Sequence, residues 1–267
     1  MSKIFDCITF FNENFITNFR FEVLHKFVDY FVVCESKFDH RGKKKKLNFF
    51  LKNKKIKNKI IYLVLDKPFL SDENLWLNQA QQREHIFEGL NEADENDLIM
   101  FSDPDEIPRP ELLKNFSLKK TYGIFLQNCF CYKFNILNQY ETPWEGTRIC
   151  QLKNLKSIDY MRQKIKKKNL QKPFWKMHIN KNIQLIKDGG WHFNSLLSPL
   201  QISIKLKTFA HSEYAAEKFS NINIIKNNIK KMRDLFGRNQ LYKKVRLDNT
   251  FPKYLLDNKL SFKKWIL

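Results

Sequence analysis

One short segment combines a hydrophobic run with a dense group of carboxylates. Four apolar residues, Leu98 to Phe101, lead directly into Ser102, Asp103, Pro104, Asp105 and Glu106. A continuous apolar run is typical of a buried parallel strand, and ligands bind outside the carboxyl ends of such strands. Asp103 and Asp105 can face the same way, so they suit Mg²⁺ or Mn²⁺ held together with a substrate phosphate. The alternative is an acidic surface turn with a helix cap.

Other carboxylates lie beside Gly, Trp or His in apolar surroundings, namely Asp188, Glu145 and Glu213. A general base in this position needs a pKa tuned by its environment. Asp188 is the first choice for such a base and Glu145 the second. Each of them could equally be a helix cap or a surface acid.

Two histidines and two glycines lie in segments that could approach a ligand. His192 follows Gly189, Gly190 and Trp191, and His211 lies in Phe-Ala-His-Ser-Glu. Either imidazole could complete a carboxylate-bound metal site or could be structural. The glycine pair permits close approach of the backbone to a ligand, or forms an ordinary tight turn.

Basic side chains are the remaining candidates for binding phosphate. Arg83 precedes the acidic segment and could pair with Asp103, bind a phosphate or lie on a solvated helix face. Arg148 and Lys205 are weaker candidates of the same type. The sequence contains neither of the two standard glycine-rich phosphate-binding motifs, G-x-x-x-x-G-K-[ST] and G-x-G-x-x-G. A nucleotide would therefore have to be held mainly by a metal and basic side chains.

The first half of the chain must position these groups, and it alternates strands with helices. Strands are predicted at residues 4–11, 28–34, 59–65 and 97–101, and helices at 15–26 and, capped by Ser71, at about 72–90. This order indicates βαβ units and a mostly parallel sheet flanked by helices, an α/β fold.

The second half has a more mixed pattern. We expect a short helix at 111–115, strands within 122–134, a loop at 144–148 leading into a strand at 149–152, an exposed Lys-rich helix at 159–168 and a strand at 183–186. Apolar residues from Phe219 to Met232 recur at helical spacing, and Gly237 is the predicted stop. No linker composition interrupts the chain, so a single domain over residues 1–267 is expected.

Composition limits the class of protein. The 267 residues are 43% hydrophobic and carry a net charge of +20. No apolar run approaches the ~20 residues of a membrane span, and the N-terminus lacks a signal-peptide layout, so a cytoplasmic protein is expected. The five cysteines lack metal spacing and are expected to be buried free thiols. The positive charge, concentrated in the lysines of residues 43–59, favours polyanionic partners or is generic solvated surface.

An ordered series of motifs runs through the chain. It comprises T-F-F-N-E at 9–13, V-D-Y-F-V-V-C-E-S at 28–36, Q-R-E at 82–84, F-S-D-P-D-E-I-P-R-P at 101–110, W-E-G-T-R at 144–148, D-G-G-W-H-F at 188–193 and K-L-K-T-F-A-H-S-E at 205–213. This series resembles glycosyltransferase family 17, the β-1,4-mannosyl-glycoprotein β-1,4-N-acetylglucosaminyltransferases, over roughly residues 3–215.

The resemblance implies a GT-A type, Rossmann-like fold and an inverting transfer of N-acetylglucosamine from a UDP-sugar with Mn²⁺ or Mg²⁺. It implies that Asp103 and Asp105 bind the metal and diphosphate and that His211 or His192 completes the metal site. Thr9, Asn12 and Glu35 would hold the nucleoside, and Arg83 and Trp191 are further candidates for the donor site. The nucleotide-binding half would be about 1–110, the acceptor-binding half about 111–215 and a helical tail about 216–267.

The animal enzymes of this family carry a membrane anchor and a stem, whereas this chain begins almost at its first strand. We therefore expect a cytoplasmic enzyme of surface glycan or glycolipid synthesis that acts on a glycan or lipid-linked glycan. Its basic face would rest on anionic membrane.

Two other classes remain open from the sequence. One is a metal-dependent phosphoryl-transfer enzyme or nuclease, although a second acidic cluster for two metals is not evident. The other is a non-catalytic nucleic-acid-binding protein. The Lys-rich segments carry few aromatics, which argues against nucleic acid as a partner.

Overall fold

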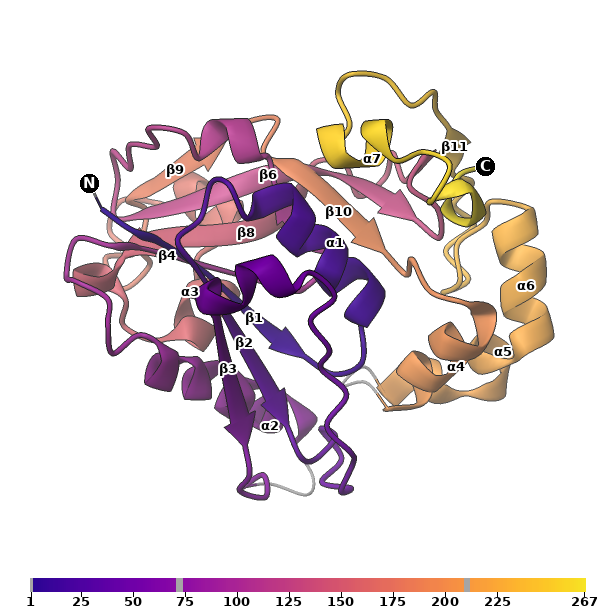
Figure 1. Cartoon of the computed structure of the whole chain (residues 1–267), viewed down its shortest axis with the longest axis horizontal. Helices are drawn as coiled ribbons and strands as arrows, with labels where there is room; N and C mark the ends of the chain where they lie inside the picture. The colour runs from indigo at the N-terminus through magenta and orange to yellow at the C-terminus, as the bar shows by residue number, and fades with distance from the viewer. Residues whose placement is uncertain (1, 71–73, 209–211) are drawn as a thin grey trace.

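A mixed eleven-stranded sheet forms the centre of the molecule (Figure 1). The computed structural model describes residues 2–70, 74–208 and 212–267. Along the sheet the strands run in the order β11-β7-β6-β8-β4-β1-β2-β3, while β5, β9 and β10 pair off this path. The strands are β1 Ile4–Phe10, β2 Tyr30–Ser36, β3 Ile60–Leu65, β4 Leu98–Ser102, β5 Glu106–Pro108, β6 Tyr122–Cys131, β7 Ile136–Leu137, β8 Trp144–Gln151, β9 Ile183–Ile186, β10 Gly190–Asn194 and β11 Lys243–Lys244.

The first four predicted strands form a parallel unit. β1 lies between β2 and β4, and β3 extends the unit beyond β2. Their carboxyl ends therefore meet at one edge, as the βαβ pattern predicted. β8 then pairs antiparallel with both β4 and β6, so the sheet is mixed beyond this unit. The expected α/β class is confirmed.

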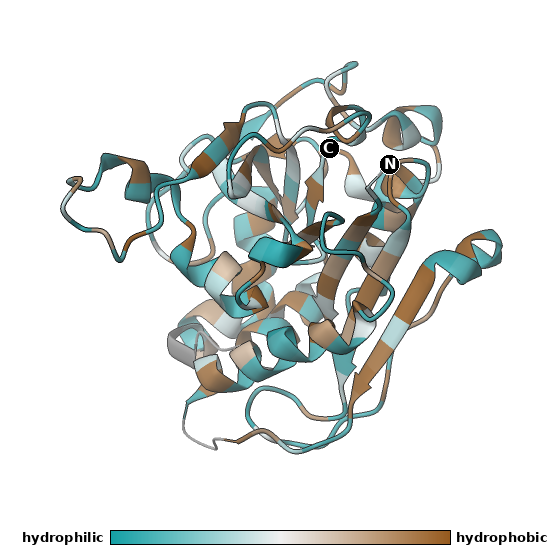
Figure 2. Ribbon diagram, turned by 90° about the vertical axis from the view of Figure 1, so that its left-hand side faces the viewer, coloured by the Kyte–Doolittle hydropathy of each residue, from teal (hydrophilic) through white to brown (hydrophobic). Residues whose placement is uncertain are grey.

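Alternating side chains divide the strands between two cores. Ile8 of β1 and Met100 of β4 belong to one hydrophobic cluster, whereas Phe5 and Phe101 of the same strands belong to the other. This period-two alternation follows from the pleat of the strand. Figure 2 shows the consequence, with hydrophobic strands at the centre and mixed colouring on the surrounding helices.

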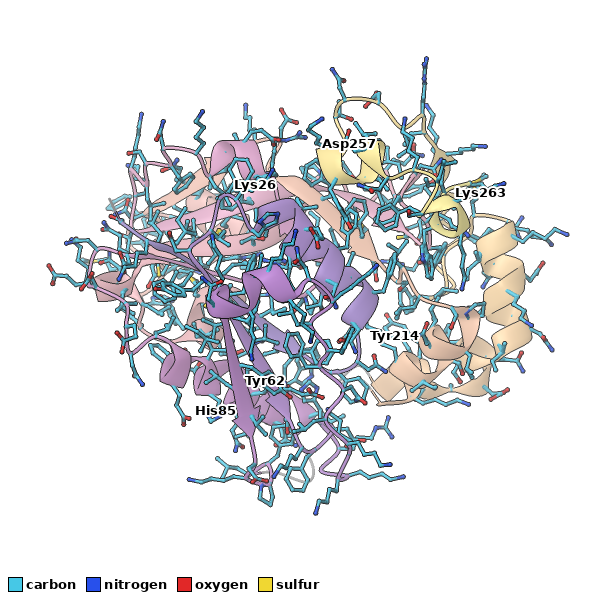
Figure 3. All side chains as sticks on the ribbon, in the orientation of Figure 1. Lys26, Tyr62, His85, Tyr214, Asp257 and Lys263 are labelled. Carbon is cyan, nitrogen blue, oxygen red and sulfur yellow. The ribbon has the colours of Figure 1, made fainter. Side chains whose placement is uncertain are left out.

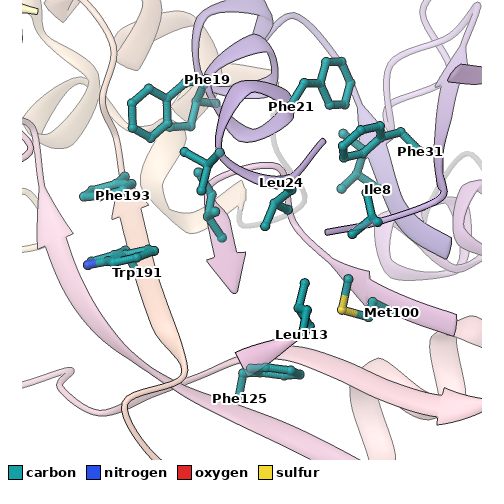
Figure 4. Packing of buried hydrophobic residues seen from close by; sticks show 14 of the residues in the cluster. Ile8, Phe19, Phe21, Leu24, Phe31, Met100, Leu113, Phe125, Trp191 and Phe193 are labelled. Carbon is teal, nitrogen blue, oxygen red and sulfur yellow. The ribbon is translucent and has the colours of Figure 1, made fainter. Parts of the chain in front are cut away.

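Helices cover both faces of the sheet. Phe19 and Leu24 of α1 pack into the first core, beside Met100 and Phe193 (Figure 4). Met161 of α3 packs into the second core. The α-helices are α1 Asn14–Leu24, α2 Leu75–Glu84, α3 Ile158–Lys164, α4 Pro199–Thr208, α5 Glu217–Ser220, α6 Ile222–Lys230 and α7 Lys253–Asp257. Short 3₁₀ helices lie at Lys54–Lys59, His85–Gly89, Pro110–Leu112, Leu152–Asn154, Lys167–Gln171, Ser212–Ala215 and Lys263–Trp265.

Several predicted elements differ in extent. The predicted loop at 144–148 is the first part of β8, because it pairs with β6. The helix predicted from Phe219 to Met232 is broken at Asn221, whose side chain caps α6, and it ends at Lys230 rather than Gly237. Ser71 lies outside the described residues, and Asn74 caps the described part of α2.

The Lys-rich helix predicted at 159–168 is shorter and less exposed than expected. It ends at Lys164, and Met161 and Arg162 on one face are buried. The five cysteines are free and buried, as predicted. Within the described ranges, no helix has the length and apolar character needed to cross a membrane.

Candidate active site

The acidic segment forms a turn at the carboxyl end of β4. Ser102 ends the strand, and the backbone N–H of Glu106 donates to the carbonyl of Asp103 at 3.0 Å to close the turn. β5 begins at Glu106 and pairs antiparallel with β10. The carboxyl end of β4 is thus tied to β10, the strand that carries His192.

A buried arginine on α1 holds this turn in place through hydrogen bonds. The guanidinium of Arg20, on α1, donates to both carboxylate oxygens of Asp6 at 2.7 and 2.5 Å. It also donates to Ser102 Oγ at 2.8 Å and to the carbonyl of Glu106 at 2.7 Å. Arg20 and Asp6 are fully buried, so their charges are compensated by each other and by these hydrogen bonds. The position of the turn therefore depends on α1 and β1.

A second arginine contacts the acidic side chains directly. Arg162, on α3, donates to Asp103 Oδ2 at 2.7 Å and to the two carboxylate oxygens of Glu106 at 2.6 and 2.9 Å. Trp144 Nε1 donates to the same Glu106 carboxylate at 2.7 Å. Burial favours a higher pKa for Asp103, but Arg162, helped by Arg83, lowers it to about 2. Asp103 is therefore ionised at neutral pH.

Asp105 has a different environment. Its carboxylate lies 3.6 Å from His192 Nε2 and 4.0 Å from Lys205 Nζ, both beyond hydrogen-bond distance. Burial raises the pKa of Asp105, and electrostatic interaction with His192 and Lys205 opposes that shift. Trp144 packs against the His192 ring at 4.8 Å between centroids. Asp105 is thus a buried carboxylate whose neighbouring basic side chains, His192 and Lys205, lie outside hydrogen-bond distance.

These groups open into a cavity of about 1020 Å³. Its walls come from the end of β1, from α2, from the acidic turn, and from β8, α3, β10 and α4. Tyr214 closes another side, between the sheet and helices α4 to α6 (Figure 3). The cavity is lined by the cations Arg83, Arg148, Arg162, Lys166, Lys168, Lys205 and Arg238 and by the carboxylates Glu13, Asp103, Asp105, Glu141 and Glu145. The volume suits a ligand of small-molecule size, and the cations suit an anionic one.

The sequence matches the model of glycosyltransferase family 17 over residues 1–264. This chain belongs to glycosyltransferase family 17. The predicted family is thereby confirmed, and the family supports glycosyl transfer as the activity of the chain. Among curated proteins, no sequence match was found.

Two solved structures show limited similarity to this family 17 chain. One is a glycosyltransferase involved in the glycosylation of the major capsid of PBCV-1, with 11% identity and a TM-score of 0.31, covering 69% of this chain and 81% of that one. The other is assigned as a glucose-1-phosphate thymidylyltransferase from Bacillus anthracis, in complex with a sucrose. It has 12% identity and a TM-score of 0.29, covering 70% and 87%. Both TM-scores are below 0.5.

Six of the predicted site residues line the cavity of the family 17 chain: Thr9, Arg83, Asp103, Asp105, Glu145 and His192. Arg83 is buried and pairs with Asp159 at 2.7 Å, rather than with Asp103. Arg148 and Lys205 also line the cavity, so the weaker basic candidates belong to the same site.

Glu35 and Asn12 do not line the cavity, in contrast to the prediction for the nucleoside site. The buried Glu35 carboxylate accepts from Lys45 Nζ at 2.6 Å, from the backbone of Asn48 and Phe49, and from Tyr62 Oη. It therefore anchors the segment 45–49 instead of facing a ligand. Thr9, Glu13 and Gln82 are polar residues that do reach the cavity from this region. The Gln82 side chain donates to the carbonyls of Phe10 and Cys34.

Trp191 and Asp188 also lie away from the cavity. Trp191 is buried in the first core, because alternation along β10 directs it opposite to His192. Asp188 is exposed in the turn before β10, and its carbonyl accepts from Arg109 Nε. Of the two carboxylates predicted as the base, Glu145 lines the cavity and Asp188 does not.

Gly189 and Gly190 allow the backbone of neighbouring strands to pack closely against them. A Cβ at Gly189 would lie 2.7 Å from the Leu126 nitrogen, and one at Gly190 would lie 2.2 Å from the Ile107 carbonyl. The close approach predicted for a ligand is thus an approach of β10 to β5 and β6.

The predicted metal ligands are only partly assembled. His211 lies outside the described residues, and nothing is described of the Glu213 side chain. Within the described ranges, no group of three or more His, Cys, Asp or Glu side chains is arranged to hold a metal ion. Asp103, Asp105 and His192 do lie at one side of the cavity.

Sequence reasoning missed Arg162, the closest cation to the acidic turn. It lies in a Lys-rich stretch that reads as a solvated helix. A signal was present in the apolar neighbours Ile158, Met161 and Ile165, whose spacing of three and four marks a buried face beside Arg162.

Proposed function

We propose that this chain is an inverting, metal-dependent GT-A type transferase that moves N-acetylglucosamine from UDP-N-acetylglucosamine to a hydroxyl of a glycan. The observation that supports it most is the Asp103–Asp105 turn at the carboxyl end of β4, open to a cavity rich in Lys and Arg. In α/β sheets this edge is where nucleotides bind. The proposed setting is surface polysaccharide or glycolipid synthesis at the cytoplasmic face of a membrane.

The residues present fit a divalent cation that arrives with the donor. Mg²⁺ and Mn²⁺ take oxygen ligands, and Mg²⁺ is commonly held by one or two carboxylates plus substrate phosphates. Asp103 is ionised, and Asp105 is a buried carboxylate that lies 3.6 Å from His192 Nε2 and 4.0 Å from Lys205 Nζ. When bound, the cation would neutralise charge on the leaving diphosphate. Arg162 and Lys205 would add positive charge on either side.

Glu145 is the carboxylate that we propose as general base. Among the carboxylates of the cavity, Glu141 pairs with Arg238 at 2.6 Å, and Glu13 accepts from the backbone of Phe11 and Asn12. Glu145 Oε2 accepts from the Lys167 backbone at 2.9 Å and lies 3.5 Å from Arg148 Nη2, and the Glu145 side chain is 31% exposed. It is thus held in place and accessible to an acceptor hydroxyl. Glu145 would accept the proton of the acceptor hydroxyl as the sugar is transferred.

The test measures UDP release from a panel of UDP-sugars, with Mn²⁺, with Mg²⁺ and with EDTA. We expect release with UDP-N-acetylglucosamine and a divalent cation. The Asp105→Ala variant should lose at least ~100-fold of turnover together with Mn²⁺-dependent UDP binding, since it removes a proposed ligand of the cation. Asp94→Ala, a change at an exposed carboxylate, is the matched control.

The same assay tests the base. Glu145→Gln should lower kcat by roughly 10²–10⁴-fold while UDP binding measured by calorimetry stays unchanged. If no nucleotide sugar is turned over and UDP binds equally well with EDTA, the proposal is wrong. Phosphodiester cleavage instead of sugar transfer would favour the phosphoryl-transfer alternative.

A further inference from the structure

A loop between α3 and β9 forms a closed protrusion at the surface. The Asn169 side chain donates to the carbonyls of Lys164 at 2.7 Å and Asn180 at 3.1 Å, and so joins the two ends of the loop. Lys181 Nζ donates to the Pro173 carbonyl at 2.5 Å. The loop therefore has a fixed base, in the manner of a compact surface loop whose ends lie close together.

The tip of this loop exposes large apolar side chains. Phe174, Trp175 and Met177 are 84%, 66% and 90% exposed. The rings of Phe174 and Trp175 pack edge to face, with centroids 5.2 Å apart. Single exposed apolar residues are normal, but a contiguous group of them marks an interaction site. Trp and Phe are the residues that favour the boundary between lipid headgroups and acyl chains.

Positive charge surrounds the apolar tip. Exposed lysines in and beside the loop are Lys164, Lys167, Lys168, Lys172 and Lys176. The stretch from 160 to 187 contains no Asp or Glu. An apolar tip with a ring of lysines complements an anionic bilayer, because the apolar groups enter the interface while the ammonium groups meet the phosphates.

We propose that residues 170–177, the docking loop, dock this protein on an anionic lipid bilayer. The basic segment 43–59, which the sequence suggested for membrane contact, has its apolar residues more dispersed: Leu47 and Phe50 are exposed, whereas Phe49 packs against Tyr62. Lys166 and Lys168, just before the docking loop, line the candidate active-site cavity. Docking through the tip therefore places one wall of the cavity beside the lipid surface. A lipid-linked glycan acceptor, which depends on the proposed glycosyl transfer, would reach the cavity from that side.

The binding test is co-sedimentation of the full chain with vesicles of phosphatidylcholine, with or without 30% phosphatidylglycerol. We expect binding only to the anionic vesicles. The triple variant Phe174→Ser, Trp175→Ser and Met177→Ser should bind at least roughly tenfold more weakly, as should Lys172→Gln with Lys176→Gln. The pair Lys55→Gln with Lys57→Gln removes the same charge from exposed positions elsewhere and should change binding less than threefold.

Insertion of the tip has a separate optical readout. Brominated acyl chains should quench tryptophan fluorescence of the wild type on anionic vesicles. Trp175→Phe should keep the binding and lose most of that quenching, because the other tryptophans lie outside the loop.

Equal weakening by both lysine pairs, or full binding by the triple variant, overturns the proposal in favour of general electrostatic attraction. Light scattering without lipid tests whether the loop tip instead binds a second copy of this chain. A dimer that the triple variant disrupts also overturns the proposal. Hydrolysis of the UDP-sugar without lipid should be the same in all variants. If hydrolysis is absent throughout while vesicle binding behaves as expected, the proposed transferase function fails and the docking loop stands.

Discussion

Single buried arginines decide the geometry of the acidic turn. Arg20 holds the backbone of the turn through Ser102 and Glu106, and Arg162 holds the carboxylates of Asp103 and Glu106. Two carboxylates near one another repel unless cations compensate them. The acidic pair therefore depends on residues from α1 and α3 that lie far from it in sequence.

Loss of Arg20 leaves Asp6 as an unpaired buried charge. We expect Arg20→Leu to reduce the free energy of unfolding by about 3–5 kcal/mol in urea denaturation. The double variant Asp6→Leu with Arg20→Leu should recover part of that loss, because neither charge is then left alone. A double variant no more stable than the single one would show that the hydrogen bonds to the turn carry the effect.

Lys166 gives the cavity a pH dependence. Burial, with Arg148 and Arg162 nearby, lowers its pKa to about 8. Its charge is present below pH 8 and lost above it, so UDP binding should weaken as pH rises, by roughly tenfold for one charge-assisted hydrogen bond.

The measurement is calorimetric titration of UDP between pH 6.5 and 9.5. Lys166→Arg keeps its charge and should flatten the profile, whereas Lys166→Gln should bind weakly at every pH. An identical slope in Lys166→Arg would assign the effect to another group. The same lowered pKa means that Lys166 disfavours folding while charged, so its contribution to stability should improve from pH 8 to 10.

At the scale of elements, α2 and α3 form the bridge between the parallel strands and the acidic turn. Glu84 at the end of α2 accepts from Ser157 Oγ and from the Asp159 backbone, and Arg83 pairs with the Asp159 side chain. Gln82 reaches the ends of β1 and β2. The three consecutive residues thus position the helix that carries Arg162. From the sequence, Arg83 alone of these three was a site candidate, as a partner of Asp103, as a phosphate ligand or as part of a solvated helix face.

The contact between β5 and β10 depends on Gly190. Its φ is +128° and an added Cβ would meet the Ile107 carbonyl at 2.2 Å. We expect Gly190→Ala to cost about 3 kcal/mol or more of unfolding free energy, since it combines a strained backbone with a backbone clash. Gly237→Ala is the control: its φ is also positive, at +71°, but its nearest neighbour is 3.8 Å away. It should cost about 1 kcal/mol, and equal losses in the two variants would contradict this account.

At the scale of the molecule, the C-terminal segment completes the first core. Phe251, Leu255 and Phe262 pack with Phe19 and Phe134, from opposite parts of the chain. The predicted helical tail, about 216–267, begins with α5 and α6. Beyond Lys230 it is largely irregular, with α7 as a short helix near α1 (Figure 1). The segment contributes by filling the core rather than by forming a helical layer of its own.

Phe262→Ala should therefore destabilise the whole protein by about 3–5 kcal/mol, as expected for a large cavity in a core. Leu260→Ala, at a side chain that is 91% exposed, should change the unfolding free energy by less than about 0.5 kcal/mol. Thermal and urea denaturation measure both. A Phe262→Ala protein as stable as the wild type would mean that the tail is not part of the cooperative unit.

The sequence by itself determined the parallel strand unit, the family and the acidic turn, because these depend on local hydrophobic patterns and an ordered series of motifs. It also named Thr9, Glu145 and His192, which line the cavity. Tertiary structure alone decided which neighbours face the ligand. Adjacent residues of β10 point to opposite sides, so Trp191 is core while His192 faces Asp105. Arg162 and Asp103 are 59 residues apart, and only the packing of α3 on the sheet brings them to 2.7 Å.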